Sequence, residues 1–188
     1  MTHFILLIVI PKRIFAQGIE AISEYIEDKM SPYSENHAVI PYIDIKYEDL
    51  IKEYEKYRQS TEYDERYNTL EKYRDEYCGY ELVDEDGNIL SSYNPNTIFD
   101  YYSIDKRNVL FNKCPNNGIH INEFLEKYEY DNTFSSIVDR NGKYHSRLEY
   151  GWFGSHNELI TKEAWKKEFE LILNNSRDDY LVNLDCHI

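Results

Sequence analysis

The chain has 188 residues, of which 35 are acidic and 21 are Lys or Arg, so its formal net charge is −14 at pH 7. General nucleic-acid binding and adsorption to anionic membranes both need a basic surface, and this charge argues against both. The length is typical of one domain that buries a sizeable core.

Cysteine usage and hydropathy indicate the compartment. Cys78, Cys114 and Cys186 are few and widely spaced, so we expect neither a disulfide framework nor a zinc-finger pattern, which favours a reducing cytoplasm. The apolar run at residues 4–10 is too short to span a bilayer and does not resemble a signal peptide. We therefore expect a cytoplasmic protein with no membrane association. Tyrosine is unusually frequent, at 19 residues, and offers stacking surface.

The first half of the chain predicts strands and helices in alternation. Residues 3–10 are apolar on both faces after His3, as expected of a central strand. Helical spacing of apolar residues predicts an amphipathic helix over 14–29, and a short strand with an internal proline follows at 37–45. Residues 47–79 are charged, rich in tyrosine and helix-favouring, with a break near 59–61. A hairpin is expected after them, around Asp86-Gly87.

The second half adds a turn at 93–96, a strand at 99–104 and a short helix over 121–128 with Asn122 as its cap. Asn141-Gly142 predicts a hairpin over 134–150, and Thr161 is expected to cap a helix that ends near residue 174. Residues 180–188 have one apolar face and one face that turns polar after Leu181, which predicts a final strand.

When the central segment at 46–130 is left out, the order of the elements predicts an α+β fold with a ferredoxin-like split βαβ core and an antiparallel sheet. We expect a single domain, with its core at 1–45 and 131–188 and a large tyrosine-rich insertion of helices and hairpins at 46–130. In that topology the first and last strands are antiparallel neighbours, and right-handed crossovers place both helices on one face. The insertion would cover the other face and form a ligand cleft with the sheet.

Side chains at the two chain ends form the sharpest candidate site. If the end strands pair, His3, Asp185 and His187 meet at one corner of the sheet. Two imidazoles and a carboxylate suit a metal ion or acid–base chemistry near neutral pH, and Glu35 could join them as a ligand or base. The structural alternative is that Asp185 and His187 hydrogen-bond each other and hold the chain terminus.

Aromatic and amide side chains elsewhere predict a platform on which a base could stack. These residues are Tyr33, Asn36, Tyr93, Asn94, Asn96, Tyr101 and Tyr102. Arg107 would neutralise a phosphate and Trp152 would line the cleft. The alternatives are that the aromatic residues fill the core beneath the insertion and that Arg107 is an ordinary solvated charge.

Several motifs together resemble a family of uncharacterised proteins encoded by phages, prophages and some bacteria. They are the His3-Phe strand, Pro32-Tyr-Ser-Glu-Asn36, Tyr93-Asn-Pro-Asn96 followed by Phe99-Asp-Tyr-Tyr102, Gly151-Trp-Phe-Gly154 and Asp185-Cys-His-Ile188. The resemblance runs nearly end to end. Family members usually carry Gly-Gly-Arg-Trp where this chain has Asp105-Lys-Arg-Asn108, so only Arg107 is retained. The resemblance implies a phage setting, in which small soluble proteins often disarm host defences.

Three functions follow as hypotheses. The first is a phage-type protein that sequesters a nucleotide-derived immune signal of its bacterial host in the cleft. The second is a hydrolase that acts on such a molecule through His3, Glu35, Asp185 and His187. The third is an acidic decoy that blocks a host defence protein. We expect no cofactor; a bound metal and homo-oligomer formation stay open.

Overall fold

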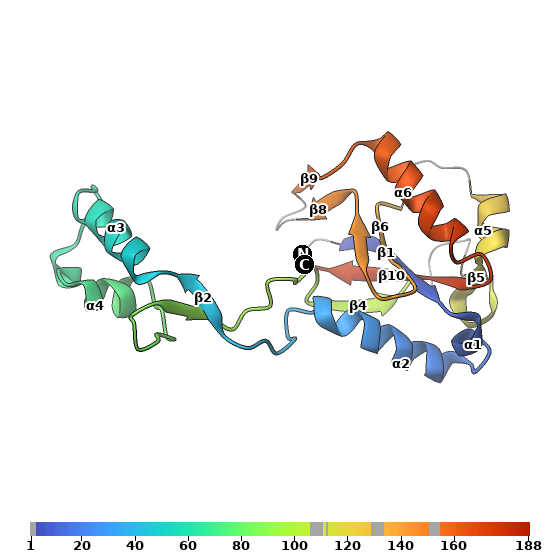
Figure 1. The fold of residues 1–188 in the computed structure, drawn as a ribbon, viewed down its shortest axis with the longest axis horizontal. Helices are drawn as coiled ribbons and strands as arrows, with labels where there is room; N and C mark the ends of the chain where they lie inside the picture. Colours follow the sequence, from blue (N-terminus) through green and yellow to red (C-terminus); the bar gives the residue numbers. More distant parts are fainter. Residues whose placement is uncertain (1–2, 106–110, 112, 129–133, 151–154) are drawn as a thin grey trace. The chain divides into compact units, whose positions relative to one another are not determined.

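In the computed structural model the chain divides into two compact units (Figure 1). Unit 1 comprises residues 1–37 and 95–188, and unit 2 comprises residues 38–94. The structure describes residues 3–105, 111, 113–128, 134–150 and 155–188. Each unit has its own hydrophobic core, so the two are described separately.

The centre of unit 1 is the pair of strands β1 (His3–Ile10) and β10 (Tyr180–His187), which run antiparallel over their full lengths. The sheet order is β4-β10-β1-β6-β7, with β4 at Tyr101–Ile104, β6 at Ser136–Val138 and β7 at Tyr144–Ser146. Strand β5 (Gly118–His120) pairs with the other half of β10. The contact of β1 with β6 is parallel, whereas the other pairs are antiparallel. The fold is therefore α+β with a mostly antiparallel sheet.

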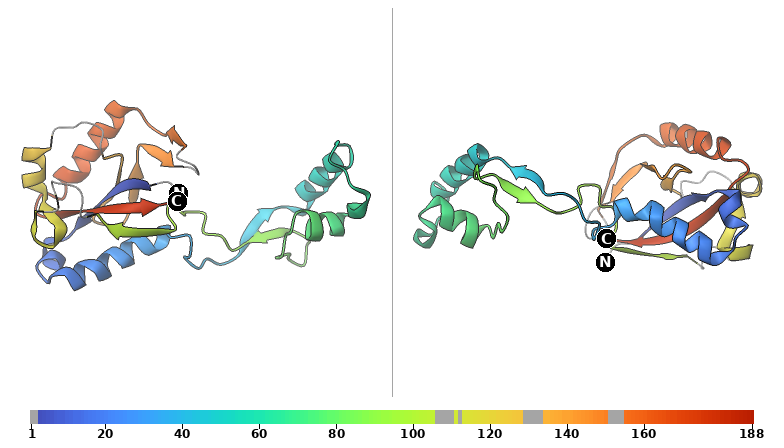
Figure 2. Two further views of the ribbon diagram at one scale, coloured as in Figure 1. Left: turned by 180° about the vertical axis from the view of Figure 1, so that it is seen from behind. Right: turned by 60° about the horizontal axis from the view of Figure 1, so that its bottom comes forward.

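Helices cover both faces of this sheet (Figure 2). Helix α2 (Ile19–Met30) packs on one face, and helices α5 (Ile121–Lys127) and α6 (Lys162–Asn174) pack on the other. Strand β1 supplies both cores because its residues are apolar on both faces. The α2 core includes Leu6, Ile8, Ile22, Ile26, Val182, Leu184 and Cys186. The α6 core includes Leu7, Val9, Phe124, Ile137, Trp165, Phe169 and Leu181.

This arrangement corrects the expected ferredoxin-like order. The strand predicted at 37–45 forms β2 (Tyr42–Ile45), which pairs with β3 (Ile89–Ser91) in unit 2 and not with the main sheet. The next strand of the main sheet after α2 is β4, and β10 follows α6. One connection runs from β1 through α2 to β4, and the other runs from β7 through α6 to β10. Both cross the sheet toward the β4 edge, but their starting strands β1 and β7 run in opposite directions. The preference for right-handed crossovers then places the two helices on opposite faces.

Local signals account for most boundaries in unit 1. The Thr161 side chain accepts a hydrogen bond from the Ala164 backbone N–H and caps α6 as predicted. The N-cap of α5 is His120 and not Asn122, because the His120 ring accepts from the Asn122 N–H. The predicted hairpin forms as β6–β7, with Gly142 at φ +89° in its turn. The remaining short elements are α1 (Lys12–Phe15), η1 (Ser31–Tyr33), η4 (Pro115–Asn117), β8 (Leu148–Tyr150) and β9 (His156–Glu158).

Unit 2 is a small tyrosine-rich module. It contains β2, α3 (Tyr47–Arg58), η2 (Glu65–Tyr67), α4 (Leu70–Lys72), η3 (Tyr73–Tyr77) and β3. The predicted helix break follows Arg58, and Leu50, Tyr57, Tyr73 and Ile89 form the core. The tyrosine rings contact one another, with the centroids of Tyr57 and Tyr77 4.6 Å apart. Much of the tyrosine surplus is therefore packing surface.

The observed unit 2 is smaller than the insertion predicted at 46–130. Of that predicted segment, β4, β5 and α5 belong to unit 1. The second face of the main sheet is covered by α5 and α6. The cover of this face is therefore made by helices of unit 1.

The two chain connections to unit 2 are held together within unit 1. Ser34 and Phe99 form a parallel β-bridge, and the Ile98 N–H donates to the Tyr33 carbonyl at 3.0 Å. The Glu35 N–H also donates to the Phe99 carbonyl at 3.0 Å. We call this pairing the root of unit 2. Its backbone hydrogen bonds join the segment that enters unit 2 to the segment that leaves it.

Candidate functional site

The two ends of the chain meet at one corner of the main sheet, as the sequence predicts (Figure 1). His3 is the cross-strand partner of His187, and Ile5 is the partner of Asp185. On the other side of β10, His187 pairs with Tyr101 of β4. Paired residues and residues two apart in a strand share a face, so His3, Asp185, His187 and Tyr101 all lie on the α6 side.

The polar side chains at this corner contact one another closely. His3 Nδ1 lies 3.1 Å from Asp185 Oδ1, within hydrogen-bond distance. The His3 and His187 ring centroids are 3.8 Å apart, and the Tyr101 ring stacks on His187 at 3.8 Å and 24°. One potential ligand atom from each of His3, Asp185 and His187 lies within 4.8 Å of the other two. We call these three residues the corner triad.

Burial differs across the triad. The His3 side chain is 48% exposed and that of Asp185 is 9% exposed, whereas His187 is buried. His187 Nδ1 has no hydrogen-bond partner among the described residues. A buried polar atom without a partner costs about 1–3 kcal/mol, so this nitrogen calls for an explanation.

The space beside the triad is a shallow hollow of about 210 Å³, lined by His3, Phe4, Ile5 and Asp185. Cys186 does not contribute to it, because its side chain lies in the α2 core on the other face. Burial raises the pKa of the Cys186 thiol well above its ordinary value, so it stays protonated and is a poor ligand. The exposed part of His3 leaves the hollow open to a small molecule.

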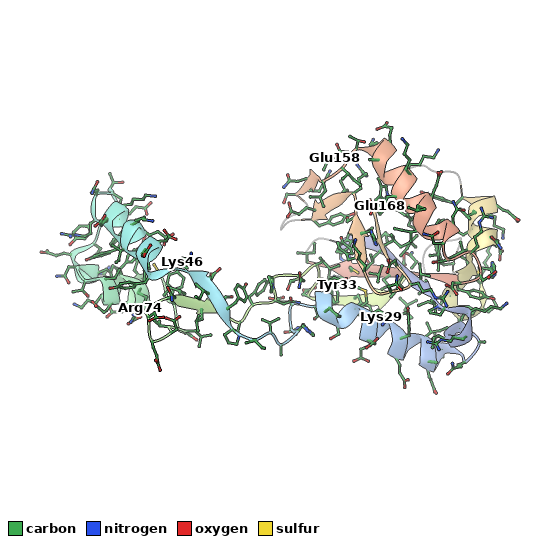
Figure 3. The ribbon with its side chains drawn as sticks, viewed as in Figure 1. Lys29, Tyr33, Lys46, Arg74, Glu158 and Glu168 are labelled. Atoms are coloured by element: carbon green, nitrogen blue, oxygen red, sulfur yellow. The ribbon has the colours of Figure 1, made fainter. Side chains whose placement is uncertain are left out.

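Two tyrosines predicted for the ligand site lie on the opposite face, and Figure 3 labels one of them, Tyr33. Tyr33 packs on the α2 core, where its hydroxyl donates to the Gly142 carbonyl at 2.7 Å and accepts from the Tyr144 N–H at 2.9 Å. Tyr102 also packs there, and burial raises the pKa of its hydroxyl. Because β4 alternates its side chains, Tyr101 and Tyr102 cannot both face the triad. Only Tyr101 joins it.

The loop residues Glu35 and Asn36 are exposed, and Glu35 is not part of the metal-ligating group found among the described residues. The predicted role of Glu35 as a third ligand or base is therefore not supported. Asn96 is exposed at the start of the second segment of unit 1.

The four remaining predicted ligand residues lie in unit 2 or outside the described residues. Tyr93 is 50% exposed and Asn94 is buried, and both belong to unit 2. Arg107 and Trp152 lie outside the described residues.

A polar pair next to the corner was missed from the sequence. Asn183 is fully buried on the same face of β10 as Asp185, and its Nδ2 donates to Asp105 Oδ2 at 3.1 Å. The Asp105 N–H donates to the Asn183 carbonyl, which extends the β4–β10 pairing. The alternation of β10 already placed Asn183 on the polar face. Its partner Asp105 follows the strand predicted at 99–104, and no pattern in the sequence indicates that the two side chains meet.

A third imidazole on the α6 side, that of His145, has a different environment. His145 Nδ1 lies 2.7 Å from Glu168 Oε1 on α6, and its Nε2 lies 3.4 Å from Asp139 Oδ2. The two carboxylates approach opposite nitrogens of the ring, so one ion cannot bind all three groups. His145 is best explained as a link between the β6–β7 hairpin and α6.

Comparisons with known proteins found no relative of this chain. No family model, curated protein or solved structure matches this chain. None of the described helices is long and apolar enough to cross a membrane.

Proposed function

We propose that the protein captures a small nucleotide-type ligand at the corner of the main sheet. The observation that carries this proposal is the Tyr101 ring, which is 46% exposed and stacked on His187 beside the half-exposed His3. An aromatic face of this kind contributes about 1–3 kcal/mol when a base stacks on it. An imidazole such as that of His3 can donate to a phosphate oxygen.

The charge of the protein limits the class of ligand. A net charge of −14 repels extended polyanions, so binding must come from local contacts that a small molecule can satisfy. In the phage setting that the motifs imply, the ligand is a nucleotide-derived immune signal in the cytoplasm of the infected host. Holding such a signal without turnover would silence the defence that depends on it.

A second function, hydrolysis of the same ligand, is favoured by the contact between His3 and Asp185. A buried carboxylate at Nδ1 orients an imidazole so that its other nitrogen can accept or donate a proton. His3 is exposed on the side of the hollow, where such a proton transfer would be needed. Capture and hydrolysis make opposite predictions about the ligand recovered after binding.

The test is recovery of the ligand. The protein is incubated with cyclic dinucleotides and with cyclic ADP-ribose-type molecules, freed of unbound ligand and heat-denatured, and the released material is identified by mass spectrometry. Intact ligand supports capture, and a cleaved product that is lost in His3→Gln supports hydrolysis. Tyr101→Ala should weaken binding at least tenfold, whereas Tyr63→Ala, which removes a 38% exposed tyrosine in unit 2, should not.

Two results would reject the proposal. One is the absence of binding to every nucleotide tested. The other is binding that is equally strong in Tyr101→Ala. Stable capture of a host nuclease or restriction enzyme in a pull-down, without any small-molecule binding, would instead favour the acidic decoy.

A further inference from the structure

We propose that His3, Asp185 and His187 bind a divalent transition-metal ion of the Zn²⁺ class, with two nitrogen ligands, one oxygen ligand and at least one open position. This site is the one that we propose for ligand capture. The metal can nevertheless be measured without any nucleotide, so the two proposals can fail separately.

The distances within the corner triad suit one ion. Ligand atoms at about 2.1 Å from a metal lie about 3.0–3.4 Å apart when they are neighbours in octahedral or tetrahedral geometry. The 3.1 Å between His3 Nδ1 and Asp185 Oδ1 already matches that spacing. The full set of three atoms lies within 4.8 Å, so small side-chain rotations would bring His187 into the same sphere. A metal ion would then replace the proton between His3 and Asp185.

The unpartnered nitrogen of His187 is the independent observation that points to a ligand. His187 is 8% exposed, and its Nδ1 has no hydrogen-bond partner among the described residues. Its ring is held between His3 and Tyr101, with both centroid distances at 3.8 Å. A buried acceptor or donor that is fixed in place and left without a partner is what a metal ligand looks like when the ion is absent. The ordinary roles of a buried histidine do not require such an atom.

The scaffold is rigid enough to hold a metal. Two ligands come from β10 and one from β1, which are paired over eight residues each in the centre of the sheet. A site built on paired strands keeps its ligands closer to the required geometry than a site on loops. The side chain of His3 is 48% exposed, so an ion can enter and keep an open position toward the hollow.

The chemistry of the donors selects the metal class. Imidazole suits Zn²⁺, Fe²⁺, Co²⁺ and similar ions, whereas Mg²⁺ and Ca²⁺ prefer sites made of oxygen ligands. Catalytic zinc sites commonly have three protein ligands and leave a further position for water or substrate. The open position of the corner triad would hold water, or a phosphate oxygen of the ligand. An ion there would also offset the negative charge of the protein where an anionic ligand binds.

The experiment is isothermal titration calorimetry of the purified, chelator-treated full chain with Zn²⁺ alone, followed by Co²⁺ titration with visible absorption. We expect one equivalent of Zn²⁺ per chain, and a Co²⁺ spectrum with ligand-field bands. His3→Gln should weaken Zn²⁺ binding at least tenfold and should not disturb folding, because His3 is half-exposed at a strand end. Asp185→Asn keeps the shape of the side chain, removes its charge and should weaken binding at least as much.

The control is His145→Gln. It removes a partly buried histidine that contacts two carboxylates, and it should leave the Zn²⁺ affinity within twofold of wild type. The proposal is overturned if the wild type binds no Zn²⁺, or if His3→Gln and Asp185→Asn bind it as tightly as wild type while circular dichroism shows them folded. Zinc binding without nucleotide capture would uphold this inference and reject the proposed function.

Discussion

Replacing His187 with phenylalanine should stabilise the metal-free protein although it removes a residue of the candidate site. The substitution keeps an aromatic ring between His3 and Tyr101, so the two ring contacts, worth about 0.5–1.5 kcal/mol each, are retained. It also removes the unpartnered Nδ1, whose burial costs about 1–3 kcal/mol. We expect a net gain of about 1–2 kcal/mol in the free energy of unfolding. At about 2–4 °C per kcal/mol for a chain of this size, Tm should rise by about 2–8 °C.

Zinc should reverse that order. At a free concentration of about 100 times its dissociation constant, a ligand that binds only the folded state adds about 2.7 kcal/mol. Wild type should therefore become more stable than His187→Phe in zinc. Removal of the zinc with EDTA should make His187→Phe the more stable protein again. The assay is thermal and urea unfolding of unit 1 followed by tryptophan fluorescence, since Trp165 is buried in the α6 core.

A matched substitution at another histidine serves as the control, and it should change the free energy of unfolding in the opposite direction. His145→Phe removes a histidine whose two nitrogens both have carboxylate partners, so it should destabilise the protein by about 1–3 kcal/mol. A lower Tm for metal-free His187→Phe than for wild type would refute the reasoning, because it would mean that Nδ1 is satisfied in solution. An equal response of both variants to zinc would refute the assignment of the metal to His187.

Three further outcomes are expected. Replacing residues 38–94 with a short Gly-Ser linker should leave unit 1 folded by circular dichroism, with Zn²⁺ affinity within twofold of wild type, because the root closes the excised loop. Trp165→Ala should lower the free energy of unfolding in urea by about 3–5 kcal/mol, since the ring is fully buried and its Nε1–H donates to the Phe134 carbonyl. Burial raises the pKa of Tyr25 from 10.0 to about 12. The unfolded state therefore loses this proton first, so stability present below pH 10 should fall between pH 10 and pH 12, and Tyr25→Phe should lose less over that window.

The sequence predicted the corner because the end strands carry unambiguous patterns. Strand β1 is apolar on both faces after His3, which favours a central position, and β10 alternates apolar and polar side chains from Val182 onward. A one-residue change of register would move every side chain of β10 to the other face, so the pairing of His3 with His187 is tightly determined. The meeting of His3, Asp185 and His187 follows from that pairing.

The other features of the fold and the site depend on strand pairing and strand order, which the periodicity of the sequence does not reveal. Strand β2 has four residues with a bulge between Ile43 and Ile45, so its pattern does not indicate which sheet it joins. Tyr101 and Tyr102 are adjacent and chemically identical, and only the register of β4 decides which of them faces the triad. The placement of α2 and α6 on opposite faces likewise depended on strand order, which local sequence does not specify.

The root of unit 2 has a consequence for how this protein can change during evolution. Ser34 and Phe99 are neighbours in space although unit 2 separates them in sequence, so recombination can exchange the intervening segment without breaking the sheet. The next residue, Asp100, donates its N–H to the His187 carbonyl at 3.0 Å. The segment between Ser34 and Phe99 can therefore be exchanged while the backbone hydrogen bond that holds His187 stays in place.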